Sequence, residues 1–466
     1  MARPSAKDPV TELVQDTLAM SKQALIFVNS KRSAEAVAED LSKRFPVQYE
    51  ELGKRVLRAL SSPTKQCKRL SFCVERGMAF HHAGLVSKQR HLVEEEFIKG
   101  ALKVIVATPT LAMGVNTPAF RVIIRDLHRF DGYMQEISVF EYMQMSGRAG
   151  RPDFHDSYGE AITIAKVPGD LAWIQERYWD GEPEPIYSKL ASLPALRTAV
   201  LSLYATRFVR NRKDLFAFFS KTFFAHQYRN IDKLKELLVE VEEQLEEWGF
   251  LRDEEATPLG RRVSQLYIDP LSAHILIEGI SSKKPKSDKA ILHAVTSCIE
   301  MRPLLRLKTS DFASADTAVE SLLPEPSVFS PEYEDFLQAA KTAAMLSLWA
   351  DEAPEELILE QYGVRPGELR AKIDTGDWLL YSATELCKLL NSERRDFLRA
   401  RLRLKYGVRP ELLPLLRIKG VGRVRARRLF NSGLESISAV AKASEEQLGK
   451  LLGKETAKRV KEQLKG

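Results

Sequence analysis

The first part of the chain, up to about residue 165, alternates short apolar runs with segments of helical periodicity. The apolar runs are residues 23–29, 78–82, 104–108, 122–126 and 161–165. The segment after the first run places Ala36, Val37, Leu41 and Phe45 at helical spacing. Strands that alternate with amphipathic helices pair in parallel, and helices cover both faces of their sheet. The pattern therefore predicts an α/β domain whose ligand-binding residues lie in loops at the carboxyl ends of the strands.

A glycine-rich string with two arginines, QMSGRAGRP, runs from Gln144 to Pro152. Arg148 and Arg151 carry planar, permanently charged guanidinium groups that match phosphate oxygens, and Gly147 lets backbone approach a ligand closely. Arginines supplied across a domain interface stabilise charge in phosphoryl transfer. The string therefore predicts a contact with the triphosphate of a nucleotide-driven motor. The alternative is a surface loop with two unrelated arginines.

The phosphate-binding loop of such a motor, G-x-x-x-x-G-K-[ST], occurs nowhere in the 466 residues. Nothing else in the sequence is placed to hold the phosphates or to orient the attacking water. We therefore expect this chain to be half of a motor and to be inactive toward ATP by itself. A truncated chain, a subunit of a split gene and an isolated piece all remain open as explanations.

Further strings follow in a recognisable order. FVNSKRSAE comes after the first apolar run, FHHAGLVSKQRHLVEEEFIKG after the second, ATPTLAMGVNTP after the third, and QMSGRAGRP last. Over about residues 20–165 this order resembles the second RecA-like domain of superfamily two helicases, with its motifs four through six. The resemblance implies ATP and Mg²⁺ as cofactors. They would be bound mainly by a first RecA-like domain, present in cis or as a separate chain.

The same resemblance implies roles for single residues. Thr108, Gly114 and Asn116 would lie where DNA contact and ATP sensing meet. The residues expected to face the nucleotide are Gln144, Gly147, Arg148 and Arg151. Arg151 is expected to be the arginine finger, with Arg148 as its partner.

Residues 121–144 carry a hairpin signal, because Asp131-Gly132 separates two strand-like stretches. The segment resembles the strand-separating hairpin of the Ski-two-like branch, and of the archaeal Hjm-type DNA helicases in particular. Phe130 and Tyr133 would then stack on the last paired base, at about 1–3 kcal/mol per base. The alternative is that these two rings fill hydrophobic gaps under the hairpin.

The rest of the chain is mostly helical and extends the resemblance over almost all of the sequence. We expect a multidomain α/β plus α protein with four domains. They are a RecA-like domain (1–180), a winged helix (181–270), a helical bundle (271–405) and a helix-hairpin-helix domain (406–466). The repeated strings YGVRPGEL and YGVRPEL predict two helix starts with proline in the first turn.

Within the bundle, residues 366–382 resemble the ratchet helix of the family. Trp378 would stack on a base and Arg370 would hold a phosphate. Where the family carries a basic residue two turns before the Trp, this chain has Ala371, so Arg370 or Lys372 would take that place. The alternative role for Trp378 is that of a core residue.

In the last domain, residues 418–422 (IKGVG) lie between two helical segments, as in the hairpin of a helix-hairpin-helix unit. Gly420 and Gly422 would expose backbone N–H groups to a phosphate at a helix N-terminus. The arginines expected to add charge are Arg423, Arg425, Arg427 and Arg428. Such a site holds phosphates without reading base sequence.

The cysteines and histidines predict no metal site. Four cysteines form no CxxC pair, and His81 and His82 have no Cys or carboxylate at ligand spacing. The sequence also contains no apolar run of the roughly 18 residues that a membrane span needs, and no signal-peptide segment at its start. We therefore expect a cytoplasmic monomer that contacts no membrane.

These features together predict the C-terminal part of an archaeal ATP-dependent DNA helicase. With its missing domain it would move 3′ to 5′ on single-stranded DNA and open forked DNA in replication-fork repair and recombination. One alternative is an RNA helicase of the same branch, against which the helix-hairpin-helix segment argues. The other is a non-catalytic DNA-binding protein, against which the intact pair Arg148 and Arg151 argues.

The distribution of charge gives a first test. Between residues 394 and 428 the sequence has thirteen Lys or Arg, opposed only by Asp396 and Glu411. If this segment binds phosphates, affinity for single-stranded or forked DNA will fall steeply with salt. For six or more phosphate contacts, the fall is about a thousandfold between low and physiological salt. Fluorescence anisotropy in a salt series measures it, and a flat series would contradict phosphate binding.

Overall fold

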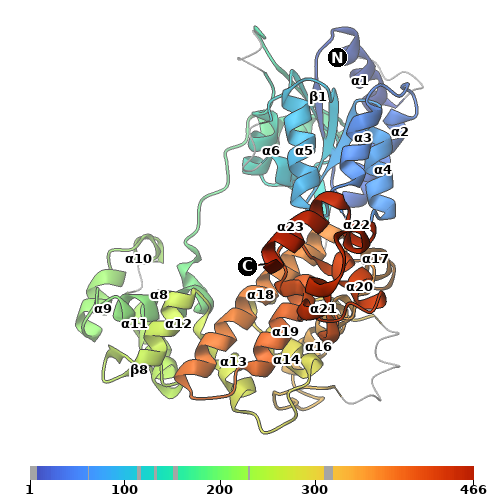
Figure 1. Cartoon of the computed structure of the whole chain (residues 1–466). Coiled ribbons are helices and arrows are strands. Elements are labelled where there is room, and N and C mark those ends of the chain that lie inside the picture. The colour runs from blue at the N-terminus through green and yellow to red at the C-terminus, as the bar shows by residue number, and fades with distance from the viewer. Residues whose placement is uncertain are drawn as a thin grey trace. The chain divides into compact units, whose positions relative to one another are not determined.

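The computed structural model describes residues 8–60, 62–112, 117–130, 134–150, 156–228, 231–308 and 319–465 (Figure 1). The chain divides into two compact units. The first runs to Ile186 and also contains Val364–Arg370, and the second consists of Tyr187–Gly363 and Ala371–Gly466. The predicted fold class, a parallel-sheet domain followed by helical domains, is confirmed.

A five-stranded parallel sheet forms the centre of the first unit, in the order β2-β3-β1-β4-β7. The strands are β1 (Ala24–Phe27), β2 (Met78–His81), β3 (Val104–Ala107), β4 (Arg121–Ile124) and β7 (Glu160–Thr163). Every residue of β1 to β4 is buried, whereas β7 is partly exposed at the edge. Burial on both faces explains why these strands appear in the sequence as unbroken apolar runs.

Helices cover this sheet. They are α1 (Pro9–Ala19), α2 (Lys31–Ser42), α3 (Glu50–Leu57), α4 (Lys65–Val74), α5 (Ser87–Ile98), α6 (Val139–Ser146) and α7 (Asp170–Ile174). Helices α2, α3 and α4 lie next to one another beside the sheet (Figure 1). Side chains cap the starts of α2 and α4: Ser30 accepts from the N–H of Ser33, and Thr64 from that of Cys67.

A short antiparallel pair projects from the main sheet after β4. Strand β5 (His128–Phe130) pairs with β6 (Met134–Glu136), with His128 opposite Glu136. Helix α6 then begins with a capping box in which Ser138 and Glu141 satisfy each other's backbone N–H groups. The tip between the two strands lies outside the described residues.

The second unit starts with helices and a two-stranded hairpin, in the order predicted for a winged helix. Its elements are α8 (Leu193–Ala205), α9 (Arg212–Phe219), α10 (Phe223–Tyr228), α11 (Ile231–Glu247), β8 (Leu251–Arg252), β9 (Glu255–Ala256) and α12 (Pro258–Leu266). Helix α8 packs against α11 and α12. The buried Glu242 accepts from the hydroxyl of Tyr204 and from Arg212, which stabilises this packing.

A group of longer helices follows. They are α13 (Pro270–Ser281), α14 (Asp288–Thr296), α16 (Glu332–Ala350), α17 (Glu355–Tyr362), α18 (Pro366–Leu389) and α19 (Arg395–Tyr406). The buried Arg403 of α19 connects several of them, because it pairs with Asp288 and Asp351 and donates to the carbonyl of Ala350. Part of the basic charge predicted to meet DNA is therefore used inside the bundle.

The C-terminal region contains two helix-hairpin-helix turns where the sequence predicted one. The first leads into α20 (Arg423–Asn431), and the second lies at Gly453, between α22 (Glu445–Leu452) and α23 (Lys454–Lys465). With α21 (Ile437–Lys442) these helices enclose a small apolar core. The predicted domain boundaries stay predictions. Nothing in the sequence predicted that Val364–Arg370 belongs to the first unit.

Within the described ranges, no helix is both long enough and apolar enough to cross a lipid bilayer.

Arg121, the first residue of β4, ties the start of the chain to the sheet. Its buried guanidinium donates to the carbonyl of Leu13 at 2.9 Å, to Asp16 at 2.7 Å and to the hydroxyl of Thr17 at 2.9 Å, all on α1. It also donates to Glu160 of β7 at 2.7 Å. One side chain thus satisfies acceptors from two other elements.

Replacement of Arg121 by Ala leaves these acceptors without their donor. We expect a loss of about 3 kcal/mol in the stability of the first unit. Hydrogen exchange of the β1 and β3 amides measures this loss. The matched control is Arg44→Ala, because Arg44 pairs with Asp40 on the exposed face of α2 at 3.3 Å and such pairs contribute little. Equal exchange in both variants would contradict the assigned role of Arg121.

Candidate nucleotide and DNA sites

The arginine string leaves the C-terminus of α6. Gln144 lies on the last turn of the helix, Gly147 is its exposed C-cap, and Arg148 follows half-buried. The backbone is fixed beside β4, because the N–H of Ala119 donates to the Arg148 carbonyl at 3.0 Å and that of Gly150 to the Ala119 carbonyl at 2.7 Å. The string is therefore held against the segment that enters β4.

Arg148 also connects the string to the segment after β3. Its guanidinium donates to the carbonyl of Ala112, which follows the short turn Pro109–Leu111. Among the described residues it forms no ion pair with a carboxylate. The structure thus brings together two of the strings that the sequence predicted to act together.

Several predicted site residues cannot be placed. Arg151, Gly114, Asn116 and Tyr133 lie outside the described residues. Phe130 is the last residue of β5, and its side chain is also outside the described part. Their roles stay predictions.

Thr108 lies at the carboxyl end of β3, as predicted for a ligand-binding loop. Its N–H donates to the carbonyl of His81 at 3.2 Å, and its hydroxyl shares a hydrogen bond of 2.9 Å with Thr110. The Thr108 side chain is buried. Its predicted DNA contact stays a prediction.

His81 and His82 have structural partners. His81 Nε2 lies 2.8 Å from Glu94, and His82 stacks on Phe80 with ring centroids 5.4 Å apart. His82 Nε2 faces the Glu35 carboxylate at 3.2 Å, while its Nδ1 accepts from the N–H of Gly84 at 3.1 Å. Burial lowers the pKa of His82, so the ring is neutral at pH 7. No group of three potential metal ligands occurs within the described ranges.

The face of α18 that was predicted to meet DNA is exposed. Arg370, Asp374 and Trp378 are all exposed, whereas Leu369 and Ile373 are buried. The Trp378 indole is 36% exposed and donates its N–H to the carbonyl of Leu266 at 3.0 Å. That bond fixes the orientation of the ring and leaves part of its surface open.

Lys372 was the alternative to Arg370 as the phosphate-holding residue. Its ammonium donates to the carbonyls of Met301 at 3.1 Å and Pro303 at 2.7 Å. These bonds hold it against the neighbouring segment of the bundle. Which of Arg370 and Lys372 would hold a phosphate stays a prediction.

Two aromatic residues near Trp378 were missed. Tyr381, one helical turn further along α18, is 38% exposed, and the guanidinium of Arg401 lies 4.9 Å from its ring centroid. Tyr267 directly follows Leu266, is 84% exposed and has a left-handed backbone with φ +58°. Helical spacing from Trp378 was enough to find Tyr381. No sequence signal indicates the conformation of Tyr267, since bulky residues rarely adopt it.

The helix-hairpin-helix turn has the geometry predicted for it. Gly420 has φ +86° and Gly422 is the N-cap of α20, and space is open around both. Arg425 and Arg428 are exposed beside them. Arg425 donates to the carbonyl of Gly420 at 2.9 Å. A phosphate contact of the backbone N–H groups and of these arginines stays a prediction.

Arg423 and Arg427 both have partners within the chain, and their predicted contact with a phosphate stays a prediction. Arg423 donates to the carbonyl of Ala353 at 2.8 Å and lies over the Trp349 ring at 4.5 Å. Arg427 pairs with Glu352 and, at 2.7 Å, with Glu411. Both residues connect the helix-hairpin-helix region to the end of α16, a role that helical periodicity alone does not reveal.

Three family models match this chain. Residues 8–153 match the helicase conserved C-terminal domain, residues 289–407 match domain 4 of an archaeal helicase, and residues 412–465 match a SAM-like helix-hairpin-helix tandem. The last match agrees with the two turns seen in the structure.

Similar proteins cover nearly the whole chain. An ATP-dependent DNA helicase Hel308 from Methanocella arvoryzae is 41% identical over 455 residues, which is 92% of this chain and 60% of the relative. Relatives of the same name from Methanococcus vannielii and Pyrococcus horikoshii are each 36% identical and cover 94% of this chain. The chain spans 65% and 63% of the lengths of these two relatives.

The half-exposed rings on α18 give a test of DNA binding. Trp378→Ala and Tyr381→Ala each remove a surface for base stacking, so each will weaken binding of an oligo(dT) strand by about 1–3 kcal/mol, or roughly 5- to 150-fold. Fluorescence anisotropy measures the change. Phe329→Ala is the control, because Phe329 is a 95% exposed aromatic in the turn before α16. If all three variants bind like the wild type, α18 is not a stacking surface.

Proposed function

Because the chain belongs to the Hel308 family of archaeal, Ski-two-like helicases, we propose that it supplies the second motor domain and the DNA-holding tail of an ATP-dependent DNA helicase. The motor would move 3′ to 5′ and open forked DNA during replication-fork repair and recombination. It would act as a cytoplasmic monomer once a first RecA-like domain is present, in cis or as a separate chain.

The observation that carries this proposal is the arrangement around Arg148. The arginine string is fixed beside β4, and Arg148 reaches the segment after β3 without a carboxylate partner in the described part of the chain. Two strings from different loops therefore meet at Arg148, where a nucleotide held by another domain would find a guanidinium that no described carboxylate pairs with. This geometry suits an arginine that acts on a triphosphate bound elsewhere.

The chain's own residues would serve ATP and Mg²⁺ held by the first RecA-like domain. Gln144 and Gly147 would approach the nucleotide through the exposed end of α6. Arg148 and Arg151 would stabilise negative charge on the transferred phosphoryl group, which makes hydrolysis depend on closure of the two domains. No residue described here replaces the missing phosphate loop.

The tail would hold the DNA. Trp378 and Tyr381 offer ring surfaces along α18, Arg370 offers charge on the same side, and the turn at Gly420 and Gly422 offers backbone N–H groups. The strand pair β5 and β6 would part the duplex at its tip. An RNA helicase is the less favoured function, because the relatives are DNA helicases and a helix-hairpin-helix tandem suits duplex phosphates.

ATP hydrolysis tests the proposal. The purified chain will show no DNA-stimulated ATPase, and addition of the first RecA-like domain of a relative will restore it. In the restored enzyme, Arg151→Ala will lower turnover by about a thousandfold or more while DNA affinity stays within about twofold. Arg44→Ala serves as a control, because Arg44 is an exposed arginine outside both motor strings and outside the basic segment 394–428. Turnover by the chain alone, or full turnover by the Arg151 variant, would refute the proposal.

A further inference from the structure

Helix α18 begins in one compact unit and continues in the other. Its start, Val364–Arg370, belongs to the unit of the parallel sheet, while the rest of the helix, with Trp378, belongs to the second unit. Its contacts with Lys31, Glu35 and Gly84 lie within the first unit. They involve residues that the proposed function does not use.

The first of these contacts is a hydrogen bond between two backbone groups. The N–H of Gly367 donates to the carbonyl of Gly84 at 3.0 Å. A Cβ atom on Gly367 would collide with the carbonyl oxygens of Ala83 and Leu85, and one on Gly84 would collide with the side chain of Arg365. Both positions therefore need glycine for this close approach.

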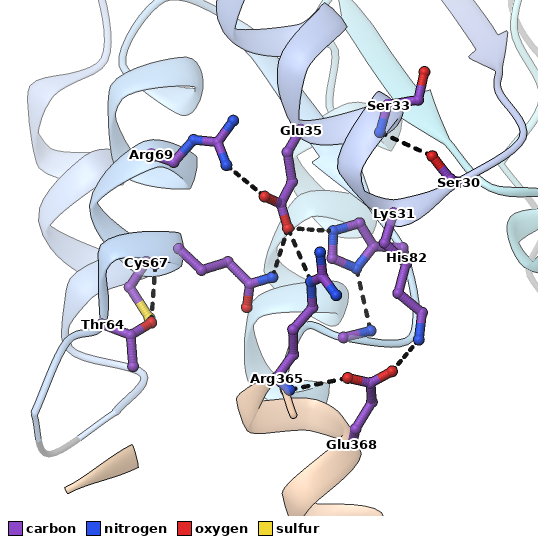
Figure 2. Close-up of polar contacts among 12 residues, drawn as sticks. Ser30, Lys31, Ser33, Glu35, Thr64, Cys67, Arg69, His82, Arg365 and Glu368 are labelled. Atoms are coloured by element: carbon purple, nitrogen blue, oxygen red, sulfur yellow. Dashed lines mark hydrogen bonds and ion pairs between the residues drawn. The ribbon is translucent and has the colours of Figure 1, made fainter. Parts of the chain in front are cut away.

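The Glu35 carboxylate is the second contact and lies on α2. Figure 2 shows the side chains of Arg69 from α4, of His82 and of Arg365 from the start of α18 directed at it, and Gln66 of α4 is a fourth partner. Gln66 Nε2 lies at 2.9 Å and Arg365 Nε at 3.2 Å. Burial alone would raise the pKa of Glu35, but hydrogen bonds from His82 and Gln66 and the charge of Arg365 lower it to about 2. The carboxylate is therefore ionised at pH 7.

Glu368 completes the arrangement (Figure 2). It accepts from the N–H of Arg365 at 2.9 Å and pairs with Lys31, the first residue of α2. Lys31 and Glu35 lie one turn apart on α2, and Arg365 and Glu368 lie one turn apart at the start of α18. Two ion pairs thus connect α2 to the start of α18. In one pair α2 supplies the cation, and in the other α2 supplies the carboxylate.

The repeated string supports a docking role. In the second copy, Val408 is buried like Val364, Arg409 donates to the carbonyl of Asp351 at 3.3 Å, and Glu411 pairs with Arg427. In both copies the Arg and the Glu around the proline bind a neighbouring element. The string thus has a use beyond starting a helix.

We propose that Glu35, with Arg365 and the Gly84–Gly367 contact, anchors the start of α18 to the RecA-like unit. This proposal rests on the function proposed above. Motion of the unit that carries Arg148 and Arg151 then passes directly to the helix that carries Trp378. Glu35 is a positioning residue in this scheme, and it touches neither nucleotide nor DNA.

Hydrogen exchange of the full chain tests the anchor. In Glu35→Gln, four donors face a neutral amide, so the amides of Gly367 and Leu369 will exchange about tenfold faster or more. Amides of β1 and β3 will keep their wild-type rates. The matched control is Glu39→Gln, because Glu39 lies one turn further along α2 and binds Arg69 at 2.7 Å without contacting Arg365. Faster exchange throughout the sheet would mean that Glu35 only stabilises the fold, and unchanged exchange at Gly367 would remove the anchor.

A second variant, Gly367→Ala, breaks the contact from the side of α18 and leaves Glu35 intact. In the motor restored with a first RecA-like domain, both variants will keep DNA-stimulated ATP turnover within about twofold. Both will unwind about tenfold fewer base pairs per ATP than the Glu39→Gln control. Unwinding that stays coupled to hydrolysis would overturn the transmission role. If the wild-type chain shows no ATPase after the first RecA-like domain is added, the proposed function is refuted. The hydrogen-exchange data would still decide whether the start of α18 is anchored.

Discussion

A buried carboxylate organises the side of the sheet on which α2 and α4 lie. Removing Glu35 from water is costly unless donors replace its hydration, and here they come from α4, from the turn after β2 and from the start of α18. His82 Nε2 lies 3.2 Å from the carboxylate, and the N–H of Gly84 occupies the other ring nitrogen. Segments far apart in the sequence are thereby held together, because each supplies a polar group to the same buried carboxylate.

The fold of the first unit was predictable, because strands buried on both faces leave a plain apolar signal in the sequence. The arginine string and its neighbour after β3 were also predictable as partners, and the bond from Arg148 to Ala112 agrees with that. The membership of Val364–Arg370 in this unit was not predictable. It depends on the close contact between Gly84 and Gly367, which are far apart in the sequence. The spacing of apolar residues gives no sign of such a contact.

The basic segment shows why charge density alone does not identify a binding surface. Arg403 is buried among acceptors, and Arg423 and Arg427 hold the helix-hairpin-helix region to the end of α16. Arg425 and Arg428 in the same short stretch remain exposed. A sequence shows how many guanidinium groups are present, whereas only the packing of the helices shows which of them face solvent.

The bond between Gly84 and Gly367 joins uncharged backbone groups at a distance too short for any side chain to intervene. Dissolved ions weaken attraction to DNA phosphates, but they have little effect on a contact between peptide groups or on a buried ion pair. Rising ionic strength would thus release bound nucleic acid at a salt concentration that leaves the start of α18 in place. On the proposed function, the protein would dissociate from DNA with the contact between Gly84 and Gly367 intact, and it could bind another strand without refolding.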